Sequence, residues 1–295
     1  MNIVILSFGG GAGHLARAFS IFESFKRNAA EPYLFTIITD SPLDVGDCYK
    51  DLEIYQVLIE PEKIFLDDKN TAIYNILKHI DPDLIISDMN WLILRPILDD
   101  FKAKKVILFR YVHDEILHIP SVDGLIHSFD PEEYDLAFTI EPSFSIEGCI
   151  SLHPTINVHP SSNYEEKIIR QVLKVPEDKK LALLAHNGFE GELDTILKEI
   201  KIDPEEYCFR SISTFDDEIS RQIFPLSHYM SGVDFSIGGC GYNFFYETKA
   251  HGIPSLYFPQ PRKGNEQHWR LDHNKDYGGP YDGADKMVEM ILDLF

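Results

Sequence analysis

Short apolar runs alternate with amphipathic stretches along the whole chain. Residues 2–7 form a continuous apolar run that ends at glycines, which is typical of a strand buried on both faces of a parallel sheet. From Gly13 onward the spacing turns helical, and Phe19, Phe22 and Phe25 share one face that we interpret as core. The same patterns predict further strands at 33–39, 53–59, 83–87, 105–111 and 136–140, and a further helix at 70–80.

A second series of the same kind begins after residue 160. It comprises predicted helices at 165–173, 192–200, 243–251 and 283–294, and predicted strands at 180–185, 207–211, 233–237 and 255–258. Pro154 and Pro160, which lie between the two series, are linker signals. The alternation of strands and helices indicates βαβ units, so we predict an α/β protein of two domains, 1–160 and 161–295.

The charge narrows the classes of partner. The 295 residues include 27 Lys+Arg against 48 Asp+Glu, which gives a formal net charge of -21. A surface this acidic repels phosphate backbones and anionic membranes, so we expect no nucleic-acid partner and no docking on such membranes. A small anion can still bind, because helix N-termini and loop amides hold phosphate without any basic side chain.

Cysteine spacing and hydropathy exclude other classes. Cys48, Cys149, Cys208 and Cys240 are far apart and have no histidine at zinc-finger spacing, which indicates neither a disulfide framework nor a metal site. The first residues lack the features of a signal peptide, and no apolar stretch reaches the roughly 18 residues that span a bilayer. We therefore expect a cytoplasmic protein without a transmembrane segment.

The first glycine-rich loop, residues 8–13, joins a predicted strand to a predicted helix. It is not a P-loop, because no Gly-Lys-Ser/Thr follows, and its glycines lack the dinucleotide-binding spacing. Asp40, at the end of the second strand, keeps a nucleotide cofactor open as an alternative, since it could hold a ribose. His14 starts the helix at the carboxyl edge of the sheet, where peptide dipoles favour its neutral form. That position suits a catalytic base and a packing residue equally.

The second glycine-rich loop, residues 238–243, also joins a strand to a helix. Glu247 follows within that helix, and a polar loop at 259–269 contains Gln267. Glycine amides for a diphosphate, a carboxylate for a ribose and amides for a sugar form a coherent ligand set. For Glu247 alone, a solvated helix carboxylate is the simpler interpretation.

These segments resemble the two-domain GT-B glycosyltransferases. The relevant branch is that of the peptidoglycan enzyme that moves N-acetylglucosamine from UDP to a lipid-linked acceptor. The glycine loop and Gly-His at 7–14 are similar to the amino end of that family, and 187–191 to its first carboxyl-domain loop. The most specific similarity runs from 233 to 271 and includes the second glycine loop.

The resemblance implies two Rossmann-like doubly wound domains facing a cleft, the first on the acceptor side and the second binding a nucleotide sugar. In such enzymes the glycine loop takes the diphosphate, the helix glutamate takes the ribose hydroxyls, and the glutamine reads the sugar. Donor-binding roles carried over from the family fall on Gly11, Gly13, Gly188, Phe224, Gly239, Gly241, Asn243, Glu247 and Gln267. His14, or failing it Asp88 or Asp114, would take the proton from the acceptor hydroxyl.

The resemblance therefore implies a metal-independent glycosyltransferase with a UDP-sugar substrate, possible donors including UDP-N-acetylglucosamine, an unidentified acceptor and no cofactor. Asp81-Pro82-Asp83 spells the Asp-x-Asp of metal-dependent transferases, but it precedes a strand and is expected at the edge away from ligands. Little sequence follows Gln267, so we expect a reduced crossing helix, and no membrane-facing patch supports a lipid acceptor. A nucleotide-sugar hydrolase like that of the pseudaminic acid pathway and a non-catalytic nucleotide-binding module stay open as alternatives.

Overall fold

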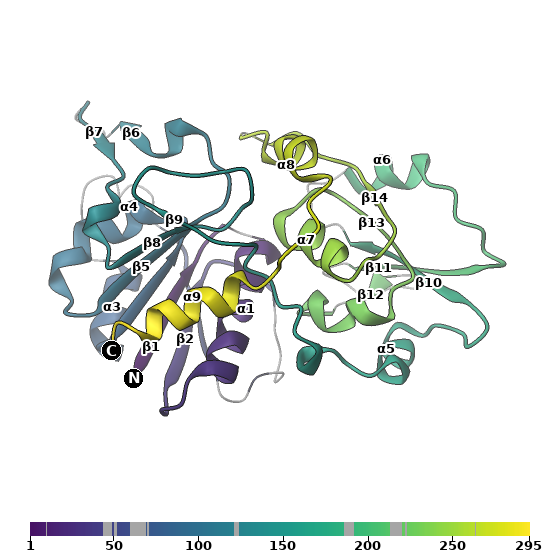
Figure 1. Ribbon diagram of the computed structural model, residues 1–295, viewed down its shortest axis with the longest axis horizontal. Coiled ribbons are helices and arrows are strands. Elements are labelled where there is room, and N and C mark those ends of the chain that lie inside the picture. The colour runs from purple at the N-terminus through teal and green to yellow at the C-terminus, as the bar shows by residue number, and fades with distance from the viewer. Residues whose placement is uncertain are drawn as a thin grey trace. The chain divides into compact units, whose positions relative to one another are not determined.

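The chain divides into two compact units. The computed structural model describes residues 1–9, 11–43, 49, 52–59, 69, 71–120, 124–185, 192–212, 220–221, 223–262 and 264–295. Unit 1 consists of Met1–Thr155 and Asp282–Phe295, and unit 2 consists of Ile156–Tyr281 (Figure 1). Each unit contains its own parallel sheet, as the alternating sequence pattern predicts.

Unit 1 is built on a seven-stranded sheet in the order β3-β2-β1-β4-β5-β8-β9. Every neighbouring pair in it is parallel. Strand β1 (Asn2–Ser7), which lies between β2 and β4, is buried from Ile3 to Ser7, which explains its unbroken apolar run. The strands are β1 (Asn2–Ser7), β2 (Leu34–Thr39), β3 (Leu52–Gln56), β4 (Leu84–Asp88), β5 (Lys104–Phe109), β8 (Leu136–Thr139) and β9 (Ile150–Ser151).

Helices and 3-10 turns cover this sheet. They are α1 (Ala12–Asn28), α3 (Ala72–Ile80), α4 (Trp91–Leu94), α9 (Gly283–Leu292), η2 (Arg95–Asp100), η3 (Asp114–Ile116) and η4 (Pro131–Glu133). A short antiparallel hairpin of β6 (His118–Pro120) and β7 (Ile126–Ser128) follows β5. Phe19, Phe22 and Phe25 expose 2%, 2% and 0% of their surfaces, which confirms that this face of α1 is core.

The last helix, α9, belongs to unit 1 and lies beside α1 (Figure 1). Asp285 Oδ1 accepts hydrogen bonds from Ser24 Oγ at 2.6 Å, from Arg27 Nη2 at 2.8 Å and from Asn28 Nδ2 at 3.1 Å. One sequence expectation is corrected by this contact, because the second domain does not run from 161 through 295 but ends at Tyr281. The C-terminal helix α9 comprises 10 residues.

Unit 2 contains a five-stranded parallel sheet in the order β12-β11-β10-β13-β14. Its strands are β10 (Lys180–Ala185), β11 (Tyr207–Ile212), β12 (Ser220–Arg221), β13 (Phe235–Gly238) and β14 (Ser255–Tyr257). Its helices and turns are α5 (Glu166–Leu173), α6 (Glu192–Glu199), α7 (Tyr242–Ala250), α8 (Glu266–Asn274), η5 (Pro160–Ser162) and η6 (Leu226–Gly232). Helix α8 corrects the prediction that 259–269 is all loop.

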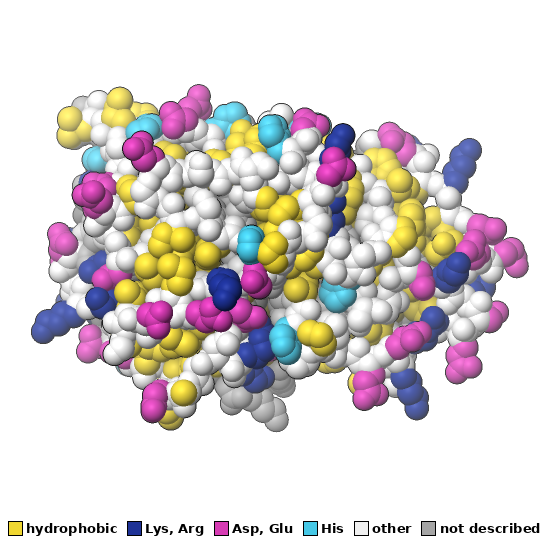
Figure 2. Space-filling model, viewed as in Figure 1, with side chains coloured by type: hydrophobic (Ala, Val, Ile, Leu, Met, Phe, Trp, Pro, Cys, Tyr) yellow, Lys and Arg dark blue, Asp and Glu magenta, His cyan; other side chains and the backbone are white. Residues whose placement is uncertain are grey.

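The charged side chains do not gather into one patch on the face shown in Figure 2, where acidic groups are spread among basic ones. Among the helices that the structure describes, none is long and apolar enough to cross a bilayer.

Candidate functional site

His14 lies at the carboxyl edge of the unit 1 sheet, against the first glycine loop. The loop backbone is held by Asp40, whose Oδ1 accepts a hydrogen bond from the Gly9 N–H at 2.8 Å. A Cβ at Gly9 would lie 2.4 Å from His14 Cδ2 and 2.6 Å from His14 Nε2, and the Gly9 φ is +150°. Only glycine therefore lets the imidazole ring lie this close to the loop. One oxygen of Asp40 therefore holds the loop backbone.

Asp88 reaches the same edge from the end of β4. The next residue, Met89, has a φ of +67°, so the chain turns sharply as it leaves the strand. Asn90 stabilises this turn because its Nδ2 donates to the Asp88 carbonyl at 2.6 Å and to the Phe8 carbonyl at 3.3 Å. These bonds connect the end of β4 with the loop that follows β1, and they hold the backbone from which the Asp88 side chain extends.

His14, Arg17 and Asp88 form a buried polar cluster. His14 Nδ1 lies 2.8 Å from Asp88 Oδ2. Arg17 Nη2 lies 2.9 Å from the same Oδ2, and Arg17 Nε lies 3.3 Å from Oδ1. Arg17 Nη2 is also 3.1 Å from His14 Nδ1. Asp88 exposes 0% and Arg17 1% of its surface, whereas the His14 side chain keeps 16%. The histidine is thus the member of the cluster that can meet a ligand.

The electrostatics of the cluster keep the carboxylate ionised and the imidazole neutral. Burial acts to raise the pKa of Asp88, but Arg17 and His14 outweigh it and bring that pKa to about 2. Burial lowers the pKa of His14, and Arg17 and Arg110 act in the same direction against Asp88. Asp88 Oδ2 is the nearer partner of Nδ1 and only accepts hydrogen bonds, so we assign the proton to Nδ1 and the lone pair to Nε2; in this tautomer Arg17 Nη2 donates to Asp88 and not to Nδ1. A neutral imidazole in this tautomer can remove a proton through Nε2.

Asp114, the third candidate base, is not part of this cluster. It begins η3, its side chain is 89% exposed, and its Oδ1 lies 3.9 Å from His118 Nε2. The structure therefore brings together His14 and Asp88 and leaves Asp114 in a solvated position on the same edge of the sheet.

The second glycine loop lies at the carboxyl edge of the unit 2 sheet. A Cβ at Gly238 would lie 2.4 Å from the Ala185 carbonyl oxygen and 2.7 Å from Phe244 Cε1, so this strand end has no room for a side chain. Gln267 Oε1 accepts from the Cys240 N–H at 3.0 Å and from the Gln260 N–H at 2.9 Å. These two bonds engage the side-chain oxygen of Gln267 with the backbone. The NH2 group of the same side chain is therefore the part that can donate to a ligand.

Glu247 is buried in α7, one turn and a half after the loop. It exposes 3% of its surface, and this burial raises the pKa of its carboxyl to about 8. The interpretation of Glu247 as a solvated helix carboxylate is therefore wrong. Within the described residues, no basic group acts on its pKa. A buried acid without a cationic partner suits a ligand that brings hydroxyl groups.

The remaining predicted donor-binding residues have varied surroundings. Gly11 and Gly241 are the N-cap residues of α1 and α7, and neither helix has an acidic residue in its first turn. A Cβ at Gly13 or Gly241 would meet nothing within 4 Å, so the space above both is open. Asn243 is buried in the first turn of α7, Phe224 is half-buried before η6, and Gly239 follows β13. Gly188 lies outside the described residues.

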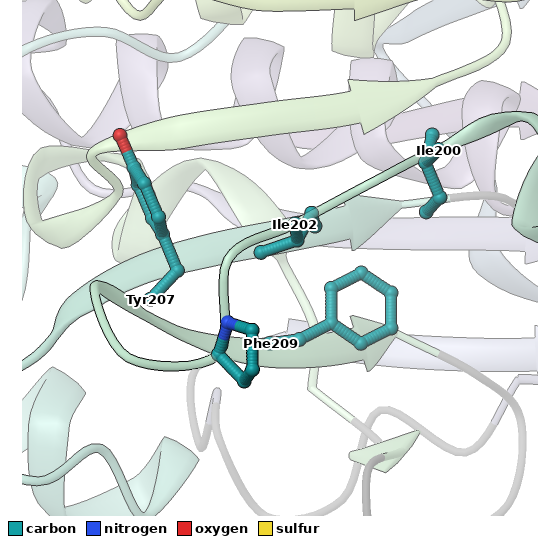
Figure 3. A pocket seen from close by; sticks show the side chains of 5 residues that line it. Ile200, Ile202, Tyr207 and Phe209 are labelled. Atoms are coloured by element: carbon teal, nitrogen blue, oxygen red, sulfur yellow. The ribbon is translucent and has the colours of Figure 1, made fainter.

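One apolar hollow of about 270 Å³ lies elsewhere in unit 2 (Figure 3). It is lined by Ile200, Ile202, Pro204, Tyr207 and Phe209. Tyr207 begins β11, so the hollow is at the amino end of this strand, opposite the edge that carries the glycine loop. Ligands of open parallel sheets bind at the carboxyl ends of the strands, so we assign this hollow no part in the site.

The Asp-x-Asp segment lies at the amino edge of the unit 1 sheet, as its position before a strand predicts. Asp83 directly precedes β4, and its Oδ2 accepts from the Asn2 N–H at 2.7 Å. The described residues contain no cluster of three or more histidine, cysteine or acidic side chains that could hold a metal ion.

Comparison with known proteins identifies the fold. No family model and no curated protein matches the sequence. A MurG of Acinetobacter baumannii is 12% identical over 99% of this chain and 90% of that one, with a TM-score of 0.50. The spinosyn rhamnosyltransferase SpnG complexed with thymidine diphosphate is 10% identical over 99% and 92%, with a TM-score of 0.55. UGT2 of Phytolacca americana, complexed with UDP-2fluoro-glucose and pterostilbene, is 11% identical over 99% and 90%, with a TM-score of 0.51.

The chain has the GT-B fold. This confirms the predicted class of two Rossmann-like doubly wound domains. Identities of 10–12% establish the fold alone, so the roles of individual residues have to be argued from the geometry above.

Two residues at these sheet edges escaped the sequence analysis: Arg17 and Arg270. Arg17 follows His14 by three positions on one helix, a spacing that places both on the same face and could have been noticed. Arg270 follows Gln267 by the same spacing, and its Nη1 donates to the Cys240 carbonyl of the glycine loop. The signals were present, but polar residues at helical spacing are usually solvated.

The two ends of the second glycine loop should respond differently to an added methyl group. Gly238→Ala is expected to lower the unfolding free energy by about 1–3 kcal/mol, because the methyl group would overlap the Ala185 carbonyl and the Phe244 ring. Gly241→Ala is the matched control, since its Cβ enters open space at a φ of -60°. Urea denaturation of both variants measures the difference, and equal stability would contradict the packing argument.

The buried Glu247 should also make the unfolding free energy depend on pH. Its folded pKa of about 8 lies above the ordinary 4.5, so between these values the folded protein binds more protons than the unfolded one. The unfolding free energy therefore falls as pH rises through this window, by at most about 1.4 kcal/mol per pH unit. Glu247→Gln should remove this decline, and Glu177→Gln, at an exposed position, should keep it. Parallel curves for wild type and Glu247→Gln in urea titrations at pH 6–8 would contradict the assignment.

Proposed function

We propose that the protein is a glycosyltransferase that moves a sugar from a nucleoside diphosphate, with UDP the first candidate, to an acceptor hydroxyl by direct displacement. The observation that supports this most is the buried pair of His14 and Asp88 at the carboxyl edge of the first GT-B unit. His14 Nε2 would remove the acceptor proton as the oxygen attacks the anomeric carbon. Asp88 would hold the imidazole tautomer, and the proposal gives Asp114 no step.

The donor would bind to unit 2. The open space at Gly241 and the N-terminus of α7 offer amides and a positive dipole end to the diphosphate, with Gly239 and Asn243 beside them. Glu247 would accept from the ribose hydroxyls, and the NH2 group of Gln267 would donate to the sugar. The Cys240 amide is engaged by Gln267 and contributes nothing to the diphosphate. Gly11, Gly13, Gly188 and Phe224 keep the donor-binding roles that the resemblance implies.

The nucleotide preference rests on the ribose contact and on the named neighbours. Two of the GT-B structures above carry a thymidine diphosphate or a UDP-sugar, which share a pyrimidine diphosphate. UDP has two ribose hydroxyls where thymidine diphosphate has one, so a carboxylate that accepts from both favours UDP. The proposed transfer uses no metal ion, because helix ends and amides would stabilise the leaving diphosphate.

A donor screen tests the proposal. The protein is incubated with UDP-, TDP- and GDP-sugars in the presence of EDTA and a mixture of sugar and phenol acceptors, and the products are identified by mass spectrometry. We expect UDP release that depends on an acceptor and yields a glycosylated product. UDP and free sugar formed at the same rate without acceptor would identify a hydrolase instead. Failure of every nucleotide to bind in calorimetry would reject both enzymes.

A further inference from the structure

We propose that Arg17 is a positioning residue that serves as the permanent counter-ion of Asp88 and thereby keeps His14 available as an unprotonated base. The inference deepens the proposed function, on which it rests for the role of His14.

The geometry places the guanidinium between the two other members of the cluster. Arg17 lies three residues after His14 on α1, so both side chains leave the same face of the helix. Its Nη2 is 2.9 Å from Asp88 Oδ2 and 3.2 Å from Asp88 Oδ1, and its Nε is 3.1 Å from Oδ2. The same Nη2 is 3.1 Å from His14 Nδ1. Both oxygens of the carboxylate thus receive hydrogen bonds from one fixed cation.

The charges of Asp88 and Arg17 determine how favourable it is to protonate His14. Asp88 and Arg17 together are neutral, so a proton added to His14 would put an uncompensated positive charge into a site that is almost closed to water. Without Arg17, the buried Asp88 would carry an unbalanced negative charge, and protonation of His14 would cancel it. Arg17 therefore adds to the effect of burial and favours the neutral form of the imidazole.

Other influences on the pKa of His14 either add to the effect of Arg17 or oppose it. Burial favours the neutral ring, Asp88 favours the protonated ring, and Arg17 and then Arg110 favour the neutral ring again. Arg110 directly follows β5, so its contribution comes from a separate strand and persists when Arg17 is replaced. A merely structural arginine would hold α1 against β4 without changing the titration of His14.

Titration of His14 by NMR tests the inference without any sugar nucleotide. The protein is labelled with 15N-histidine, and the His14 signals are assigned by their loss in His14→Gln. We expect wild type to show the tautomer with the proton on Nδ1 and a pKa below the ordinary value. Arg17→Met should raise the pKa of His14 by about one unit or more, which is about tenfold in the acid constant. Arg17→Lys, which restores the charge, should reverse most of this shift.

Arg27→Met is the matched control, because Arg27 lies on the same helix and pairs with Asp285 at 2.8 Å. It should leave the titration of His14 unchanged. If Arg17→Met does not fold, Arg17→Gln, which is neutral but still donates a hydrogen bond to Asp88, takes its place with the same expected shift. An unchanged His14 pKa in the neutral variant, or a wild-type proton on Nε2, would overturn the inference. A negative donor screen would instead reject the proposed function and leave this result intact.

Discussion

His14→Ala is expected to lower the turnover number by about 10²- to 10⁴-fold, the usual contribution of a positioned general base. The reason is that His14 is the member of the cluster whose side chain keeps 16% exposure, while Asp88 is fully enclosed. Nucleotide affinity should change by less than about twofold, because the proposed contacts with the ribose and the diphosphate are made by Glu247 and the second glycine loop and not by His14. Steady-state rates with the donor and acceptor found by the screen, together with calorimetry for UDP, measure both quantities.

His113→Ala provides the control for this substitution. His113 also follows a strand of the unit 1 sheet, but its ring packs edge-on against Tyr111 and has no carboxylate behind it within the described residues. We expect this variant to retain most of the wild-type rate. Equal rates for His14→Ala and wild type would assign the proton transfer to another group.

Glu247→Ala is expected to weaken UDP binding by roughly 1.5–3 kcal/mol, or about 10- to 150-fold in Kd, by removing a charge-assisted contact with the ribose. Burial raises the pKa of this carboxyl to about 8, so a proton must leave before it accepts from both hydroxyls. Wild-type affinity should therefore increase as pH rises from 6.5 to 8.5. Calorimetry across this range is the measurement, and the variant should lack the increase.

The ligand itself supplies the sharpest control for Glu247. With 2′-deoxy-UDP, one of the two hydroxyls is missing, so the wild type should lose affinity while Glu247→Ala should bind both nucleotides with similar Kd values. Lys249→Ala, which removes a charge from the same helix, should leave the preference for UDP intact. An equal penalty for the deoxy ligand in wild type and Glu247→Ala would place the ribose elsewhere.

The sequence pattern predicted the sheets well and the second half of the chain less completely. Buried parallel strands such as 2–7 and 180–185 are short apolar runs, and the βαβ alternation predicts their parallel pairing. Helix α8 was missed because its buried face consists of Gln267, Arg270 and Asn274, which are polar. Periodicity of apolar residues cannot find a helix whose inner face binds a loop rather than a core.

The candidate site, too, was predicted only in part. Local patterns place His14 after a glycine loop and Asp88 at the end of a strand, and the parallel pairing of β1 and β4 brings both to the same edge of the sheet. Whether Glu247 is solvated or buried depends on the packing of α7 on its neighbours, which no local pattern encodes. The enclosure of Arg17 has the same origin, because it depends on Asp88, which lies 71 positions away along the chain.

The packing of α9 against α1 has a consequence for the order in which the two units fold during synthesis. Unit 2, residues 156–281, is an insertion between two parts of unit 1, so it emerges from the ribosome entirely before the segment that completes its host. Until then, the α1 side chains Ser24, Arg27 and Asn28 lack Asp285, and the apolar positions of α9 that cover this face are absent. The unit that carries His14 is thus the first to start folding and the last to finish.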